Sequence, residues 1–329
     1  MLSLVLCLLA LPALLLLIEV LAERRDRLRY PAPGRFAVEN GLHVLEQGSE
    51  GPRVILESGL AATSISWVKT QSEAAEFARV IAYDRAGLGW SPGRKSPLAL
   101  DDLLNDLAHL VNADSTPVIL VGHSFGALLV SAFANQHPDQ VAGLVLVDPV
   151  SVATYARPDE FHAARLQRAI RLSKRGAVLA RFAVVRIALS LLARGSRKLP
   201  VMIGRLSAGK GTTIMQRLAG EVAKLPPSAY GPIRSHWSRP ESFHLMADYL
   251  RLLPYAAAQV QKLAVPAQIP VVILSAASAT ASEVREREDL VCTHPASRHT
   301  QIPNTTHWVQ LDRPDLVVAA IRELALRIE

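Results

Sequence analysis

Residues 118–130 read VILVGHSFGALLV, a largely apolar run that holds one serine between two glycines. The run has the composition of a buried strand before Gly122 and the periodicity of a helix from Phe125 onward. A turn this tight leaves little room, and Gly122 and Gly126 relieve the crowding because neither carries a Cβ. Ser124 is then exposed beside the free N–H groups of the helix start. These residue types suit nucleophilic attack by the Ser124 hydroxyl, with the backbone N–H of Phe125 donating to an oxyanion.

The elements around this turn alternate between strand and helix patterns. Continuous apolar runs rich in β-branched residues are typical of parallel strands that are buried on both faces. Because helical patterns follow most of these strands, the alternation indicates a parallel sheet with crossover helices. The sequence predicts strands at 41–47, 53–57, 80–83, 117–121, 141–147 and 270–275, and helices at 101–111, 125–136 and 314–327.

The region 151–265 lacks strand patterns and carries arginine-rich helical ones instead. We interpret it as a helical insertion between two strands of the sheet. Within it, residues 152–210 contain thirteen Lys or Arg side chains against two carboxylates. The segment lacks the aromatic interleaving of a stacking surface and the motifs of a nucleic-acid-binding protein, so the sequence favours anionic lipid over nucleic acid as the partner of the basic segment.

The first eighteen residues, MLSLVLCLLALPALLLLI, form an apolar stretch that would reach roughly 27 Å as a helix. No Lys or Arg precedes the stretch, whereas Arg24, Arg25, Arg27 and Arg29 follow it. By the positive-inside tendency, residues 1–30 are predicted to form a single-pass membrane anchor with the catalytic domain on the cytoplasmic side. A cleaved secretory signal is the alternative, with cleavage near Ala22 and an exported protein.

Two segments give the sequence a family resemblance. GHSFG, at 122–126, fits the G-x-S-x-G nucleophile elbow, and in its strand-turn-helix context it resembles the elbow of the α/β-hydrolase family. VILESGLAATSISW, at 54–67, resembles the family's segment that supplies a second oxyanion donor. The resemblance assigns that donor to the backbone N–H of Leu60, where Ser58-Gly59 replaces the usual His-Gly pair.

A third segment, VIAYDRAGLGWS at 80–91, resembles the family's loop after the next strand. In that loop Asp84 and Arg85 are expected to brace the elbow rather than to react. The resemblance implies an α/β-hydrolase fold with a mostly parallel central sheet and flanking helices. It also implies a helical lid insertion, and here an N-terminal apolar helix precedes the fold.

The family's acid and base follow the serine in the order Ser, acid, His. His307, in NTTHWVQLDRP just before the last predicted helix, matches the position of the base. Two residues remain open for the acid. Asp148 directly follows the strand 141–147, a position that the family uses less often, and it is the favoured choice. Glu283 is the first carboxylate after the strand 270–275, which is the commoner position.

The resemblance implies a serine hydrolase that cleaves a carboxylic ester through an acyl-serine intermediate, and the apolar, basic insertion favours a lipophilic ester. Amidase, peptidase and acyltransferase activities would use the same residues, and a non-catalytic binding protein of this fold is a further alternative. No cofactor is needed, and with only Cys7 and Cys292 and no metal-ligand spacing, a metal has no support. The expected layout is an anchor or signal at 1–30, a hydrolase core at 31–150 and 266–329, and a cap or lid at 151–265.

Overall fold

The structure of the protein is a computed structural model that describes residues 2–37, 39–94, 96–193, 222, 224–294 and 296–328. Within these ranges, the side chains of residues 2–9, 192 and 193 lie outside the description. The chain divides into two compact units. The core unit comprises residues 33–166 and 249–329, and the helical unit comprises residues 1–32 and 167–248.

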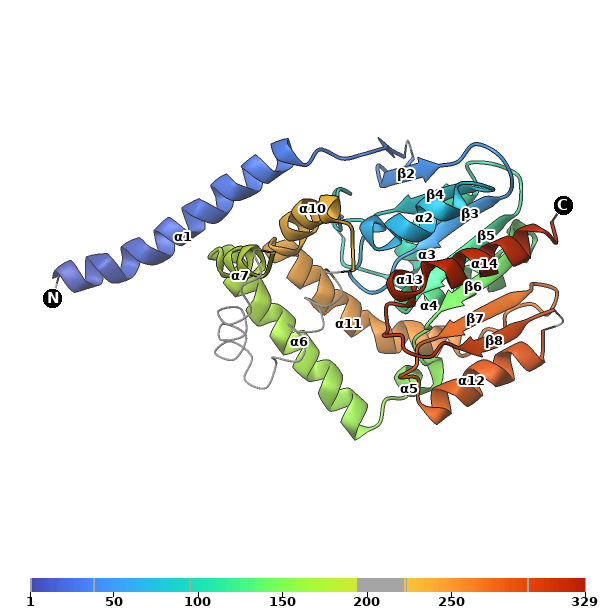
Figure 1. Ribbon diagram of the computed structural model, residues 1–329. Helices are drawn as coiled ribbons and strands as arrows, with labels where there is room; N and C mark the ends of the chain where they lie inside the picture. The colour runs from blue at the N-terminus through green and yellow to red at the C-terminus, as the bar shows by residue number, and fades with distance from the viewer. Residues whose placement is uncertain are drawn as a thin grey trace. The chain divides into compact units, whose positions relative to one another are not determined.

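An eight-stranded sheet forms the centre of the core unit (Figure 1). Its strands are β1 (Arg35–Phe36), β2 (His43–Gln47), β3 (Arg53–Glu57), β4 (Arg79–Tyr83), β5 (Val118–His123), β6 (Val141–Val147), β7 (Val271–Ser275) and β8 (Arg298–Gln301). Their order across the sheet is β1-β2-β4-β3-β5-β6-β7-β8. The pairs β1/β2 and β2/β4 are antiparallel, and all other neighbouring pairs are parallel. The prediction of a mostly parallel sheet is confirmed.

Helices cover both faces of this sheet (Figure 1). One face packs against α2 (Val68–Ala74), α13 (Val309–Asp312) and α14 (Pro314–Ala325), and the other against α3 (Leu100–Val111) and α4 (Phe125–Gln136). α12 (Ala281–Cys292) packs beside β7 and β8, and α5 (Val152–Ala156) follows β6. Alternate strand side chains such as Val54 and Leu56 join Trp67 and Val317 in a core cluster that is closed to solvent.

The register of the parallel strands brings their carboxyl ends to one edge of the sheet. Glu57 of β3 lies opposite Gly122 of β5, and His123 lies opposite Val147 of β6. Val147 in turn lies opposite Leu274 of β7. Residues that directly follow these strands therefore meet, although the chain separates them widely.

The helical unit contains α1 (Leu2–Arg29), most of α6 (Glu160–Arg181), α7 (Val184–Ala193), α10 (Pro227–Trp237) and the first part of α11 (Pro240–Val260). Every regular element that the structure describes between residues 151 and 265 is a helix, as the sequence predicts. The role of this insertion as a lid stays a prediction.

A buried cluster of charges joins α1 to α7 inside the helical unit. The guanidinium of Arg186 donates to both carboxylate oxygens of Glu19, at 2.9 and 2.7 Å, and also to Asp26. All three side chains are buried. Glu19 and Asp26 lie seven residues apart and so share one face of α1, which is the face that this cluster covers.

From residue 10 onward, α1 exposes several large apolar side chains, among them Leu11, Leu14 and Leu17. Within the part of the chain that the structure describes, no helix combines the length and apolarity needed to cross a membrane. The predicted anchor starts in residues 2–9, whose side chains lie outside that part.

Candidate active site

Ser124 lies in the turn between β5 and α4, as the sequence predicts. Its φ is 54°, in the left-handed region that non-glycine residues seldom occupy. A Cβ at Gly122 would lie 2.6 Å from the backbone of Ala127, and one at Gly126 would lie 2.5 Å from the carbonyl oxygen of Glu57. Both glycines are therefore required, because only a bare backbone lets strand and helix approach this closely.

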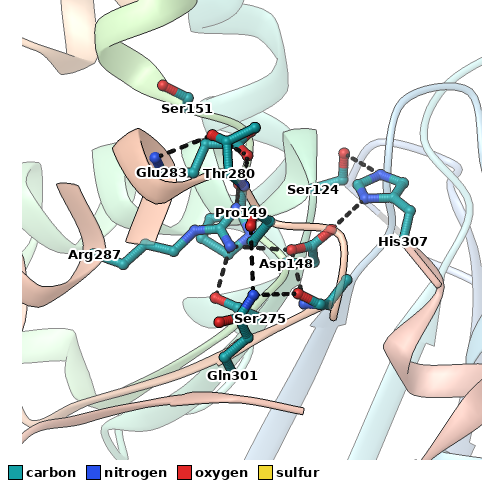
Figure 2. A network of polar contacts seen from close by, with 12 residues as sticks. Ser124, Asp148, Pro149, Ser151, Ser275, Thr280, Glu283, Arg287, Gln301 and His307 are labelled. Carbon is teal, nitrogen blue, oxygen red and sulfur yellow. Dashed lines mark hydrogen bonds and ion pairs between the residues drawn. The ribbon is translucent and has the colours of Figure 1, made fainter. Parts of the chain in front are cut away.

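His307 lies in the loop between β8 and α13, and its side chain faces Ser124 (Figure 2). Nε2 of His307 is 2.9 Å from Oγ of Ser124. The side chain of His307 is 47% exposed, so a bound molecule can reach the pair from solvent. The loop is fixed by Thr306, whose backbone N–H and hydroxyl both donate to Asp312 at 2.7 Å. The serine and the histidine are thus held within hydrogen-bond reach.

Asp148 follows β6 and contacts the other side of the His307 imidazole (Figure 2). Its Oδ2 lies 2.6 Å from Nδ1 of His307. Its Oδ1 accepts hydrogen bonds from the backbone N–H of Ala276 at 3.0 Å and from Arg287 at 3.1 Å. Burial alone would raise the pKa of Asp148, but the contacts with His307, Ala276 and Arg287 outweigh it and hold the pKa below its ordinary value. The carboxylate is therefore ionised and can accept a hydrogen bond from the Nδ1–H of His307.

Glu283, the alternative acid, lies elsewhere. It is the third residue of α12, where its carboxylate accepts hydrogen bonds from the backbone N–H and the hydroxyl of Thr280, both at 2.8 Å. The Thr280 hydroxyl accepts from the backbone N–H of Glu283 in return, which completes a capping box. The structure thus joins Asp148, and not Glu283, to His307.

The two expected oxyanion donors lie on neighbouring segments. A Cβ at Gly126 would strike the carbonyl oxygens of both Glu57 and Ser58, so the segment after β3 packs directly on the first turn of α4. Among the described residues, neither the N–H of Phe125 nor that of Leu60 donates to another protein group. Two free N–H groups next to a serine hydroxyl suit an oxyanion. Their role as an oxyanion hole stays a prediction.

A buried polar cluster holds the segment that carries Leu60. Arg85 donates to Glu57 at 3.0 Å, to the carbonyl oxygen of Ser58 at 3.1 Å and to that of Gly59. In a trans peptide the C=O and the following N–H point in opposite directions, so the bond from Arg85 to Gly59 turns the N–H of Leu60 away from Arg85. Arg85 therefore braces this loop, and the sequence had indicated such a bracing role.

His123 is a neighbour of the site whose contacts the sequence did not reveal. Its Nε2–H donates to the carbonyl oxygen of His307 at 2.8 Å, and its ring lies 4.7 Å from the His307 ring and 5.3 Å from that of Trp308. Burial, and then the nearby charge of His307, lower the pKa of His123 to about 3. His123 is thus a neutral side chain that connects the end of β5 to the loop of His307.

A second histidine–aspartate pair lies away from Ser124. Nδ1 of His43 is 2.9 Å from Oδ2 of Asp84, and both side chains are closed to solvent. The nearby hydroxyl of Ser91 donates to the carbonyl oxygen of Asp84 at 2.5 Å and accepts from the backbone N–H of His43 at 2.8 Å. With its serine bound to backbone and no access from solvent, this group braces the loop after β4. Within the described ranges, no cluster of His, Cys, Asp and Glu could hold a metal ion.

Comparison with known proteins places the chain in a family. The family model described as alpha/beta hydrolase fold matches residues 52–314. Lipase LipV of Mycobacterium tuberculosis is 38% identical over 110 residues, which cover 33% of this chain and 41% of the lipase. Epoxide hydrolase 3 of Xenopus tropicalis is 26% identical over 85% of this chain and 73% of its own length. The chain spans less than half the length of the first curated relatives.

Solved structures show the same fold at low sequence identity. The enol-lactonase of Burkholderia xenovorans is 20% identical and has a TM-score of 0.57, with 86% of this chain and 95% of that chain covered. At this identity the likeness concerns the fold alone.

Proposed function

Because the chain belongs to the alpha/beta hydrolase family, we propose that it is a serine hydrolase that cleaves a carboxylic ester through an acyl-Ser124 intermediate. The observation that carries the proposal is the relay from Oγ of Ser124 to His307 at 2.9 Å and from His307 to Asp148 at 2.6 Å. A serine hydroxyl becomes a useful nucleophile only beside a base, and a base needs a partner that fixes its tautomer. The nucleophile, the base and the partner of the base are thus adjacent to one another.

The proposed reaction follows from the positions of the protons. A carboxylate only accepts hydrogen bonds, so the proton of His307 lies on Nδ1 and its Nε2 is free to accept. As Oγ of Ser124 bonds to the acyl carbon, its proton passes to Nε2 and the carbonyl electrons move to the oxygen. The N–H groups of Phe125 and Leu60 stabilise that oxyanion. The C–O bond then breaks, and His307 returns the proton to the leaving alcohol.

Water completes the cycle by the same route. It attacks the acyl carbon while His307 takes its proton, and the acid leaves as Ser124 regains a hydrogen. Asp148 stabilises the imidazolium in both halves, since its carboxylate is already ionised. No step needs a cofactor or a metal ion.

The proposed substrate is a lipophilic ester, and the proposed cap or lid over it is the insertion 151–265. The support is the composition of the insertion, which alternates apolar residues with arginines. One relative, named as a lipase, is consistent with ester chemistry. A panel of esters, amides and acyl acceptors would separate this proposal from an amidase, peptidase or acyltransferase.

We also propose that α1 attaches the protein to a membrane with the core unit on the cytoplasmic side. Leu11, Leu14 and Leu17 are 59%, 53% and 52% exposed, and apolar residues around a helix favour a lipid environment. Cleavage near Ala22 would remove Glu19 and its pairing with Arg186, so the buried cluster favours an intact helix. Detergent-dependent extraction and an unprocessed N-terminus in mass spectrometry would support the proposal. A mature terminus at Glu23 would contradict it.

A fluorophosphonate probe tests the catalytic proposal directly, because it labels only an activated serine. The wild-type protein should be labelled and Ser124→Ala should not, with a loss of about 10⁴-fold or more in ester turnover. Ser131→Ala, on the helix α4 that follows Ser124, is the matched control and should behave as wild type. An unlabelled wild type would favour the non-catalytic binding protein.

A further inference from the structure

We infer that Arg287 is a positioning residue that shares the carboxylate of Asp148 with His307 and thereby opposes the positive charge that this histidine acquires when it takes the serine proton. The inference rests on the proposed function, since it concerns the same acid and base. Arg287 lies on α12 and is 5% exposed. Nothing in the family resemblance of the sequence pointed to this side chain.

The contacts of Arg287 fix its guanidinium against the carboxylate (Figure 2). One nitrogen donates to Oδ1 of Asp148 at 3.1 Å and to the hydroxyl of Ser275 at 2.6 Å. A second nitrogen donates to the carbonyl oxygen of Pro149 at 2.7 Å. Three partners at the ends of β6 and β7 therefore hold the buried guanidinium in one orientation. An arginine that faced solvent would not make these contacts.

The two oxygens of Asp148 serve two different cationic groups. Oδ1 faces the permanent charge of Arg287, and Oδ2 faces His307, which becomes charged when it takes the serine proton. A nearby positive charge disfavours a second one, and it also neutralises part of the carboxylate field. Arg287 therefore opposes the charge of the imidazolium that Asp148 stabilises.

The other titratable groups around this pair do not replace Arg287. His299 of β8 contacts the Ser275 hydroxyl at 2.7 Å, and burial and the charge of Arg287 lower its pKa. His123 is neutral at ordinary pH. Glu286 is engaged by Ser151 and Ala153, and Glu288 acts on His299. In the described parts of the chain, Asp148 is the one carboxylate that pairs with Arg287.

Removal of the charge should leave the carboxylate in place. In Arg287→Gln, the backbone N–H of Ala276 still donates to Oδ1 of Asp148 and His307 still contacts Oδ2. The expected change is therefore electrostatic: the charged form of His307 becomes more favourable, because Asp148 no longer shares its carboxylate with a second cation.

The experiment measures the titration of the His307 imidazole by NMR in the full chain, with the resonance assigned by its loss in His307→Gln. Arg287→Gln should raise the midpoint by roughly half a pH unit or more. If the glutamine variant does not fold, Arg287→Met takes its place, because it also removes the charge and should raise the midpoint as well. Arg287→Lys keeps a charge and should stay near wild type, as should Arg285→Gln, an exposed arginine of the same helix.

The acid limb of kcat/KM for a water-soluble ester should move in the same direction, with the plateau rate changed by less than about tenfold. If the titration midpoint of His307 stays fixed or falls in the uncharged variants, the inference is overturned. Loss of a merely structural arginine would lower stability and would leave that midpoint unchanged. The NMR titration needs no turnover. An inactive wild type would thus refute the proposed function while the role of Arg287 is still decided.

Discussion

Oδ2 of Asp148 lies 2.6 Å from Nδ1 of His307, across 159 positions of the chain. Asp148 adopts a φ of 39° to reach this place, a backbone conformation that costs energy in a residue with a Cβ. The contact places a proton on Nδ1 and presents a lone pair at Nε2 to Ser124. The same backbone turn thus determines which imidazole nitrogen faces Ser124.

Asp148→Asn should therefore abolish most of the proposed activity. An amide can donate its N–H to Nδ1 and favour the wrong tautomer, so kcat should fall by about 10⁴-fold while the fold is retained. Glu283→Gln is the matched control, since Glu283 only caps α12. It should keep wild-type turnover and lose about 1 kcal/mol of stability or less. Ester kinetics and thermal unfolding of both variants measure these effects, and the reverse order would reassign the acid.

Gly59→Ala should weaken stabilisation of the transition state more than it weakens substrate binding. A Cβ at Gly59 would lie 2.7 Å from Nδ1 of His123, so either the loop that carries Leu60 or the buried His123 ring must shift. Loss of one oxyanion donor lowers kcat by about 10²-fold, and KM should change little. Gly93→Ala is the control, because nothing lies within 4 Å of a Cβ there. Equal kinetics in the two variants would remove Leu60 from the proposed oxyanion hole.

His123 should make the folded state sensitive to acid. Its pKa is about 3 in the folded protein and about 6.5 in an unfolded chain, so between these values the unfolded state binds the extra proton. Stability is then full above about pH 6.5 and falls toward pH 3, by at most about 1.4 kcal/mol per pH unit. His123→Gln removes this slope, and its amide can still donate to the carbonyl oxygen of His307. Denaturant unfolding at several pH values measures the free energy of unfolding of both proteins. The difference between wild type and His123→Gln should narrow as pH falls, and a constant difference contradicts the prediction.

Arg186→Ala should destabilise the helical unit. It leaves the carboxylates of Glu19 and Asp26 buried without their cation, and breaking a buried pair in this way costs about 3–5 kcal/mol. Arg181→Ala is the control, because Arg181 is exposed on the neighbouring helix α6. Differential scanning calorimetry should show a lower transition temperature in the first variant alone. If both variants melt as wild type, the cluster contributes nothing to the docking of α1.

The central strands could be predicted from the sequence because they are apolar on both faces. β3 and β6 have the predicted bounds, and β5 extends the predicted strand to His123. The sheet's last strand, β8, was missed, because RHTQ has neither an apolar run nor alternation and is held only by pairing with β7. The helix α12 was missed too, although Thr280 and Glu283 carry the capping-box pattern that would have located its start.

The site shows a similar division. Ser124 and Asp148 follow strands directly, so the strand pattern places them at one sheet edge. Arg287 and His123 could not be assigned, because a single arginine on a helix and a histidine within an apolar run have no pattern that names their partners. Their contacts arise from the packing of distant segments, which sequence periodicity does not encode.

The long chain separations within the site have a kinetic consequence. The contacts of His307 with Ser124, Asp148 and His123 span 183, 159 and 184 positions. Closing loops of that size costs entropy before any contact repays it, and contacts of high sequence separation form slowly. After dilution from denaturant, helical circular dichroism should therefore recover before probe labelling of Ser124 does. The labelling rate would then measure how fast the contacts of His307 with Ser124 and Asp148 form.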